Sequence, residues 1–296
     1  MTDRRSTTGA LLALLAATFF GVGGAVAGGV FDVLEPATVA QARSAIAAVL
    51  LAGWAAYRGV LWPIDRLWRF AILGVILALI NLTFYMAIDR LGVGPGATVQ
   101  FLGPIFILVW IAAVRREHVG AIAWAAAIAA ILGVGMVTSA WSGGATDVVG
   151  IAAGLAAAVL FACYLLYGEV LGRDHPPAAI GAWGFVFASV IWAIVLPWWS
   201  FPFEAARGVI VDLAVIGVIG TAAGFVVEFA ALRLASPGII GIVATAEPAI
   251  GAIAAAVLLD QRLDPVQWAG IVVVMVSVAV VQRWGLSDAP IATPVT

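Results

Sequence analysis

Lysine is absent from this chain of 296 residues, and charge of either sign is scarce. All 14 basic residues are arginines, and charged residues make up 10% of the chain against 64% hydrophobic residues. A soluble domain carries about 25% charged residues, so this chain has too few to cover a surface that faces water. We therefore predict an all-α integral membrane protein whose main surroundings are the lipid bilayer.

Other absences exclude several classes of function. Without lysine, the chain cannot form the P-loop that binds ATP phosphates. Its one cysteine, Cys163, excludes an internal disulfide and a multi-cysteine metal site. His118 and His175 each stand alone in a polar turn, so we expect no metal and no cofactor. The net charge of −2 indicates no nucleic-acid partner.

Apolar segments account for most of the chain, and a helix needs about 20 residues to cross a bilayer. We predict ten spans, at residues 9–31, 36–57, 70–88, 95–114, 120–138, 148–171, 178–199, 208–232, 237–259 and 265–284. The motif Ala25-Val26-Ala27 also fits a signal-peptidase site, which would make the first span a cleaved leader. The apolar run continues beyond that motif, which favours a span that is retained.

The two halves of the chain repeat each other. Pro104 and Pro248 lie 144 residues apart, and so do Trp124 and Trp268. We predict a five-helix repeat at residues 1–139, a second at 148–286, and a disordered tail at 287–296. Because five is odd, the second repeat must be inverted in the membrane. Inverted repeats are typical of transporters that bind substrate between the repeats.

Arginine counts predict the orientation, because loops that stay in the cytoplasm are enriched in basic residues. If the N-terminus is cytoplasmic, ten arginines lie inside and three lie outside. The inside set is Arg4, Arg5, Arg58, Arg66, Arg69, Arg115, Arg116, Arg173, Arg233 and Arg283, and the outside set is Arg90, Arg207 and Arg262. We therefore predict that both termini are cytoplasmic.

Two stretches place polar residues inside spans. The first runs from Asn81 to Pro104 and reads NLTFYMAIDRLGVGPGATVQFLGP, and the second runs from Glu228 to Pro248. Together with the tandem five-helix units, they resemble the EamA family of the drug/metabolite transporter superfamily over residues 9–284. The first stretch is most similar to bacterial amino-acid exporters, including the threonine/homoserine exporters and the aromatic amino-acid exporters of the YddG type. Gln100 stands where the threonine exporters are expected to have an acidic residue, so the aromatic type is favoured.

The resemblance implies ten helices around a central cavity, lined mostly by spans one, three, four, six, eight and nine. It also implies export of metabolites across a bacterial inner membrane. The predicted substrates are amino acids, chiefly aromatic and other large neutral ones. Two alternatives stay open: an exporter of drugs or other small metabolites on the same fold, and an intramembrane enzyme.

Seven residues are candidates for binding the substrate. Asn81, Phe84 and Tyr85 share one helical face, which lines a cavity or else holds helices together. Tyr164 and Trp183 could stack on an aromatic substrate, although membrane aromatics also serve as packing or interfacial residues. Gln100 and Thr245 complete this set.

Five further residues are candidates for coupling or gating: Arg43, Pro104, Glu228, Glu247 and Pro248. A carboxyl group at membrane depth suggests function, so Glu228 could carry a proton in exchange for substrate. Alternatively, Glu228 could form a structural ion pair with Arg43 or Arg233. Glu247 could instead form hydrogen bonds with neighbouring helices. Each proline frees the carbonyl four residues earlier, which would either line a wet cavity or mark a packing kink.

Four GxxxG pairs predict close helix contacts. These pairs are Gly24/Gly28, Gly92/Gly96, Gly150/Gly154 and Gly220/Gly224.

Overall fold

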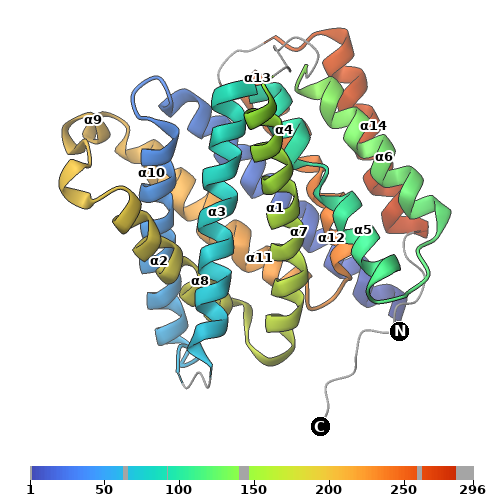
Figure 1. Cartoon of the computed structure of the whole chain (residues 1–296), viewed down its shortest axis with the longest axis horizontal. Helices are drawn as coiled ribbons and strands as arrows, with labels where there is room; N and C mark the ends of the chain where they lie inside the picture. Colours follow the sequence, from blue (N-terminus) through green and yellow to red (C-terminus); the bar gives the residue numbers. More distant parts are fainter. Residues whose placement is uncertain (1, 63–65, 92, 140–146, 259–261, 285–296) are drawn as a thin grey trace.

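A computed structural model describes residues 2–62, 66–91, 93–139, 147–258 and 262–284. The described residues form helices and turns, without strands (Figure 1). Eight helical segments are long and apolar enough to cross a membrane, and two shorter apolar helices cover residues 121–137 and 265–281. The predicted all-α membrane fold with ten spans is therefore confirmed. The predicted tail at 287–296 lies outside the described residues.

Six of the helices that the structure describes belong to the first half of the chain. They are α1 (Thr2–Val30), α2 (Pro36–Tyr57), α3 (Leu67–Leu91), α4 (Val93–Gln100), α5 (Gly103–Ala113) and α6 (Ala121–Val137). The second half supplies α7 (Val148–Asp174), α8 (Pro177–Val195), the short turn η2 (Trp198–Ser200), α9 (Phe203–Gly208), α10 (Ile210–Gly217), η3 (Val218–Ala223), α11 (Gly224–Ala231), α12 (Pro237–Ala244), α13 (Ala246–Leu258) and α14 (Pro265–Trp284).

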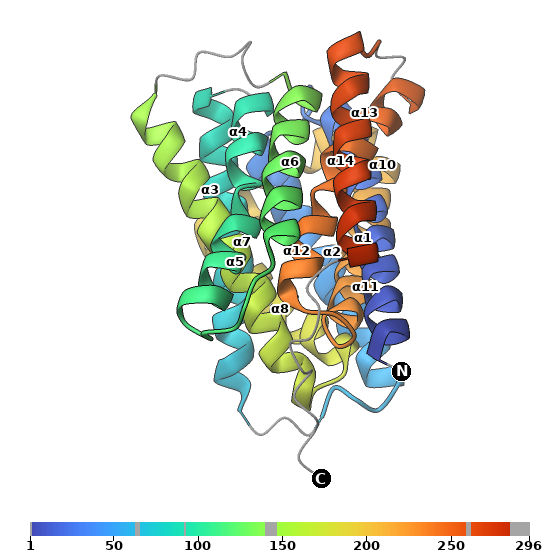
Figure 2. The ribbon, with the colours of Figure 1, turned by 90° about the vertical axis from the view of Figure 1, so that its right-hand side faces the viewer.

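The two halves interlock. The first helix of the chain, α1, packs against α10, η3, α11, α12 and α13 of the second half. Conversely α7, the first helix of the second half, packs against α3, α4 and α5 of the first. The helices α2 and α8 also pack together, and α6 and α14 lie side by side at one edge (Figures 1 and 2). Each half thus covers apolar faces of the other, and one large buried cluster runs through both.

Three of the ten spans are interrupted by breaks in the helix. The span at 95–114 divides into α4 and α5, and the span at 237–259 divides into α12 and α13. Gln100 ends α4 and Ala244 ends α12, and each lies four residues before a proline that cannot donate to its carbonyl. The third interruption is η3, one stretch of π-helix between α10 and α11.

Helix ends also differ from the prediction. The helix α3 begins at Leu67, earlier than residue 70, and α8 ends at Val195 because Pro197 follows it. The helix α1 continues through Ala25 and Ala27, which are both buried. It also packs against elements of the second half of the chain.

Glycines set the closest helix crossings, in partial agreement with the predicted pairs. An added Cβ atom on Gly220 would meet Gly23, on Gly224 it would meet Phe20, and on Gly154 it would meet Val99. The prediction for Gly24 and Gly28 is wrong, because a Cβ atom there would meet nothing within 4 Å. Gly92 lies outside the described residues.

Candidate functional site

A polar cluster lies among the spans, and it contains the cation Arg43. The Arg43 Nε atom of α2 donates a hydrogen bond to Thr221 Oγ1 at 3.0 Å, and Nη2 lies 3.5 Å from the carbonyl oxygen of Gly220. Thr221 is fully buried, and its hydroxyl donates to the carbonyl oxygen of Ile216 at 2.8 Å, five residues earlier. Both partners of Arg43 thus belong to the π-helical turn η3. Such turns are frequent at functional sites.

Glu228 of α11 is also buried, and the residue is 3% exposed. The Tyr164 hydroxyl of α7 donates a hydrogen bond of 2.5 Å to Glu228 Oε2. The predicted alternative, an ion pair of Glu228 with Arg43 or Arg233, is not found among the described residues. A carboxyl group without a cation partner at membrane depth is expensive to maintain as an ion, which favours a functional reason for keeping it.

Aromatic rings pack against Tyr164. The Tyr164 ring packs edge-on against Phe225 and Phe229, with both ring centroids 5.6 Å away. Phe185 of α8 and Phe20 of α1 pack against Phe225 in turn, at 4.8 and 4.9 Å. Tyr164 and Glu228 are both buried, so their hydrogen bond lies in the protein interior.

Glu247 is the second carboxyl group at this depth. It lies in the first turn of α13, directly after the break at Thr245, and its side chain is partly buried. It interacts electrostatically with Glu228 and with Arg43. Arg43 also interacts with the Tyr85 hydroxyl of α3. We call Arg43, Tyr85, Tyr164, Thr221, Glu228 and Glu247 the intramembrane polar cluster; it draws residues from both halves of the chain.

The other predicted binding residues lie apart from these contacts. The Asn81 amide donates to the Leu77 carbonyl oxygen of its own helix at 2.9 Å, and Phe84 packs against Tyr85. The hydroxyl of Thr245 is buried and donates to the carbonyl oxygen of Ile242.

The polar atoms of Gln100 and Trp183 differ in their hydrogen bonding. The Oε1 atom of Gln100, at the break after α4, is buried and has no hydrogen-bond partner among the described residues. Trp183 Nε1 donates to the carbonyl oxygen of Leu61 at 3.2 Å, and its ring packs against Trp62. Trp183 is therefore held by the loop between α2 and α3, at the end of the bundle where α1 begins. Its predicted role and those of Asn81, Phe84, Gln100 and Thr245 remain predictions.

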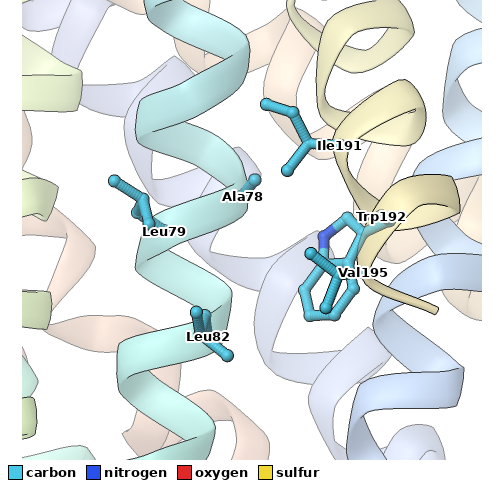
Figure 3. Close-up of a pocket in the computed structure, with 6 residues that line it drawn as sticks. All are labelled: Ala78, Leu79, Leu82, Ile191, Trp192 and Val195. Carbon is cyan, nitrogen blue, oxygen red and sulfur yellow. The ribbon is translucent and has the colours of Figure 1, made fainter.

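A separate crevice of about 80 Å³ opens between α3 and α8 (Figure 3). It is lined by Ala78, Leu79, Leu82, Ile191, Trp192 and Val195, all of them apolar or aromatic. None of the predicted binding residues lines it. Leu79, Leu82 and Val195 are exposed on the outer surface of the bundle, so this crevice faces the lipid rather than the polar cluster.

The chain matches one known protein family in both of its halves. The model of the EamA-like transporter family matches residues 7–139 and again residues 148–283. The chain belongs to the EamA-like transporter family. The two matches cover the two halves that the sequence repeat indicates, so this multi-pass membrane protein carries the EamA unit twice.

Relatives of this EamA-like chain are bacterial transporters. It is 26% identical to the uncharacterized transporter YwfM of Bacillus subtilis over 285 residues, which is 92% of each chain. It is 25% identical to the threonine/homoserine exporter RhtA of Escherichia coli K12 over 203 residues, which is 66% of this chain and 64% of RhtA. The uncharacterized inner membrane transporter YicL of Salmonella typhimurium is 23% identical over 72% of this chain and 71% of YicL.

A solved crystal structure shares the fold. It superposes with a TM-score of 0.78 at 16% identity, and the match covers 95% of this chain and 98% of the other. At that identity the likeness shows the arrangement of the helices alone.

Proposed function

We propose that this EamA-like protein exports neutral amino acids across a bacterial inner membrane. The observation that carries the proposal is the intramembrane polar cluster, because Arg43 and Tyr85 come from one half and Tyr164, Glu228 and Glu247 come from the other. In transporters with inverted repeats, the substrate binds between the repeats near the midplane and next to broken helices. The relation to the threonine/homoserine exporter RhtA supports amino acids as the substrate class.

The transport cycle would rock the two halves around this cluster. Tyr85, Asn81 and Gln100 would orient the polar end of the substrate. Gln100 Oε1, which has no hydrogen-bond partner in the described part of the chain, is an acceptor suited to an ammonium group. The apolar end would lie against aromatic rings, which supports aromatic and other large neutral amino acids as the preferred substrates. Glu228 would exchange a proton for the substrate, so export would draw on the proton gradient. The protein would transport its substrate without changing it chemically, unlike an enzyme.

Flux from proteoliposomes tests the proposal. Purified protein is reconstituted, the vesicles are loaded with the twenty amino acids, and the efflux of each is measured by mass spectrometry with and without a pH gradient. We expect selective efflux of neutral amino acids in unchanged form, faster when the gradient favours proton exchange. Flux of drugs or other metabolites without amino-acid flux would assign the alternative substrates, and a chemically altered product would indicate an enzyme.

A further inference from the structure

Tyr164 and Glu228 form a hydrogen-bonded unit between α7 and α11. The Tyr164 hydroxyl donates to Glu228 Oε2 at 2.5 Å, and the two residues are 2% and 3% exposed. Across the described ranges, the Glu228 side chain has no other hydrogen bond or ion pair. The state of this carboxyl group therefore depends on a single hydroxyl in direct contact with it.

Close packing between α7 and α11 fixes the position of that hydroxyl. Gly168 lies one turn after Tyr164 on α7, and an added Cβ atom there would come within 3.2 Å of the Phe229 ring. The Tyr164 ring also packs edge-on against Phe229 and Phe225, with both ring centroids at 5.6 Å. These two phenylalanines lie on either side of Glu228 in the sequence of α11. The ring is thus held among contacts that direct its hydroxyl to the carboxyl group.

The elements around Glu228 supply few other ionisable groups. The helix α11 packs against α1, α7, α8 and η3. The sequences of α8 and η3 contain no ionisable residue, and the ionisable residues of α1 lie at its beginning. Glu169 and Asp174 of α7 form ion pairs near the end of that helix. Glu247 of α13 interacts with Glu228 electrostatically, and its like charge would oppose a negative charge on Glu228.

We propose that Tyr164 is a positioning residue for Glu228: its hydroxyl stabilises the ionised carboxylate, so that Glu228 can release a proton inside the membrane. A proton carrier is protonated and ionised in turn during each cycle, and an ionised carboxyl group at membrane depth is costly without a partner. A hydrogen bond to an ionised group is roughly twice as strong as one between neutral groups, so the hydroxyl favours the ionised form. This inference rests on the proposed function and gives Tyr164 a role through Glu228 in place of stacking on the substrate.

Infrared spectroscopy of the purified full-length protein tests this inference without requiring transport. A protonated carboxyl group has a carbonyl stretch, and subtracting the spectrum of Glu228→Gln in the same background isolates the band of Glu228. Tyr164→Phe removes the hydroxyl and keeps the ring. At the pH at which the wild-type band has nearly vanished, we expect a band roughly 3- to 10-fold stronger in Tyr164→Phe, because the ionised form has lost its donor. The band should also move to higher frequency, because the carboxyl group has lost a hydrogen bond.

Tyr167→Phe is the matched control. Tyr167 lies on the same helix, but its hydroxyl donates to the Arg69 carbonyl oxygen at 3.1 Å, so this variant should leave the Glu228 band unchanged. Should Tyr164→Phe fail to fold, replacement of Tyr164 by a fluorinated tyrosine keeps both the ring and the hydroxyl. Fluorine makes the hydroxyl a stronger donor, so the Glu228 band should then weaken instead of strengthen.

Flux kinetics in proteoliposomes separate this role from contact with the substrate. For Tyr164→Phe we expect an unchanged KM for the substrate and a smaller effect of the pH gradient on flux. A ring that stacks on the substrate predicts another pattern, in which Tyr164→Phe changes neither value and Tyr164→Leu raises KM.

The outcomes separate this inference from the proposed function. If Tyr164→Phe leaves the Glu228 band and the effect of the gradient unchanged, the inference is overturned and the proposed function stands. If the band responds as expected but wild-type flux does not depend on the gradient, Tyr164 positions Glu228 and the proton exchange in the proposed function is wrong. If the protonation of Glu228 changes at no pH in wild type or in Tyr164→Phe, the inference and the proton-carrier role of Glu228 are both overturned.

Discussion

Gly23 of α1 and Gly220 of η3 cross so closely that a Cβ atom on Gly23 would come within 2.5 Å of the Gly220 Cα atom. The crossing joins the two halves of the chain, and Gly220 also supplies a carbonyl oxygen toward Arg43. Because both atoms at the contact belong to backbones, neither can turn aside as a flexible side chain would. The packing of the halves and the position of the polar cluster therefore depend on the same contact.

The first prediction concerns this crossing. Gly23→Ala forces α1 and η3 apart, and overpacking of this kind typically costs 1–3 kcal/mol, so we expect about that loss of stability. Thermal unfolding in detergent measures it. Gly24→Ala is the matched control: its Cβ atom meets nothing within 4 Å, and alanine is about 1 kcal/mol more favourable than glycine within a helix. Equal destabilisation by the two substitutions would show that the contact is not rigid.

The same glycines show how far sequence reasoning extends. Composition and span length predict the all-α membrane fold, because about 20 apolar residues have few other stable arrangements in a bilayer. The four-residue spacing of Gly24 and Gly28 predicts a contact, yet the contact is made by Gly23, one position away. A spacing rule identifies a candidate face of one helix, and only the position of the partner helix determines which face is used.

The sequence predicts most of the residues in the polar cluster, but not the hydrogen bonds that join them. Arg43, Glu228 and Glu247 follow from the rule that ionisable residues inside spans are functional candidates. Tyr85 and Tyr164 are candidates for binding substrate, Tyr164 as an aromatic ring that stacks on it. Thr221 is not among the predicted site residues. The hydrogen bond from Tyr164 to Glu228 joins residues 64 positions apart, and no local pattern encodes it. The anchor of Arg43 depends on the π-helical turn of η3, which brings Thr221 and the Gly220 carbonyl oxygen toward α2. The sequence around Thr221 carries no recognised signal for such a turn.

The second prediction concerns Glu228 as the proton carrier. Glu228→Gln keeps a hydrogen-bond acceptor for Tyr164 but cannot release a proton, so flux in proteoliposomes should become equal with and without a pH gradient. Among the described residues, Tyr164 donates a hydrogen bond to Glu228, and Glu247 interacts with it electrostatically. Glu204→Gln, on a side chain exposed in α9, should keep the full effect of the gradient. If Glu228→Gln retains gradient-dependent flux, Glu247→Gln becomes the variant to examine, and the role given to Glu228 is wrong.

The third prediction concerns the start of α7. Asp147 caps this helix: Oδ1 accepts a hydrogen bond of 2.9 Å from the Gly150 N–H group, and Oδ2 lies 3.2 Å from Arg90 Nη1. The Gly150 N–H group, followed by Arg90, lowers the pKa of the Asp147 carboxyl below its ordinary value of 3.8.

A lowered pKa stabilises the folded state above the ordinary pKa, and this contribution is lost as the pH falls through the lowered value. The difference in melting temperature between wild type and Asp147→Ala should therefore be constant near neutral pH and disappear in acid below about pH 4. Arg90→Ala should remove only part of the stabilisation that Asp147 provides, because the hydrogen bond between Asp147 and the Gly150 N–H group remains. A difference that persists unchanged in strong acid would mean that the carboxylate charge does not stabilise this helix.

The fourth prediction is the orientation of the bundle in the membrane. Tyr57 ends α2 and Trp199 lies in η2 after α8, so these residues mark opposite ends of the bundle, with exposed fractions of 87% and 89%. The excess of arginine at the end where α1 begins predicts that Tyr57 faces the cytoplasm and Trp199 the outside. With Cys163→Ser as background, a membrane-impermeant maleimide should label Trp199→Cys in spheroplasts and label Tyr57→Cys only after the membrane is permeabilised. The reverse pattern would place the termini outside. In that case the end of the bundle where α1 begins would face the outside, and substrate would have to enter from the opposite end. The polar cluster between the two halves would be unchanged.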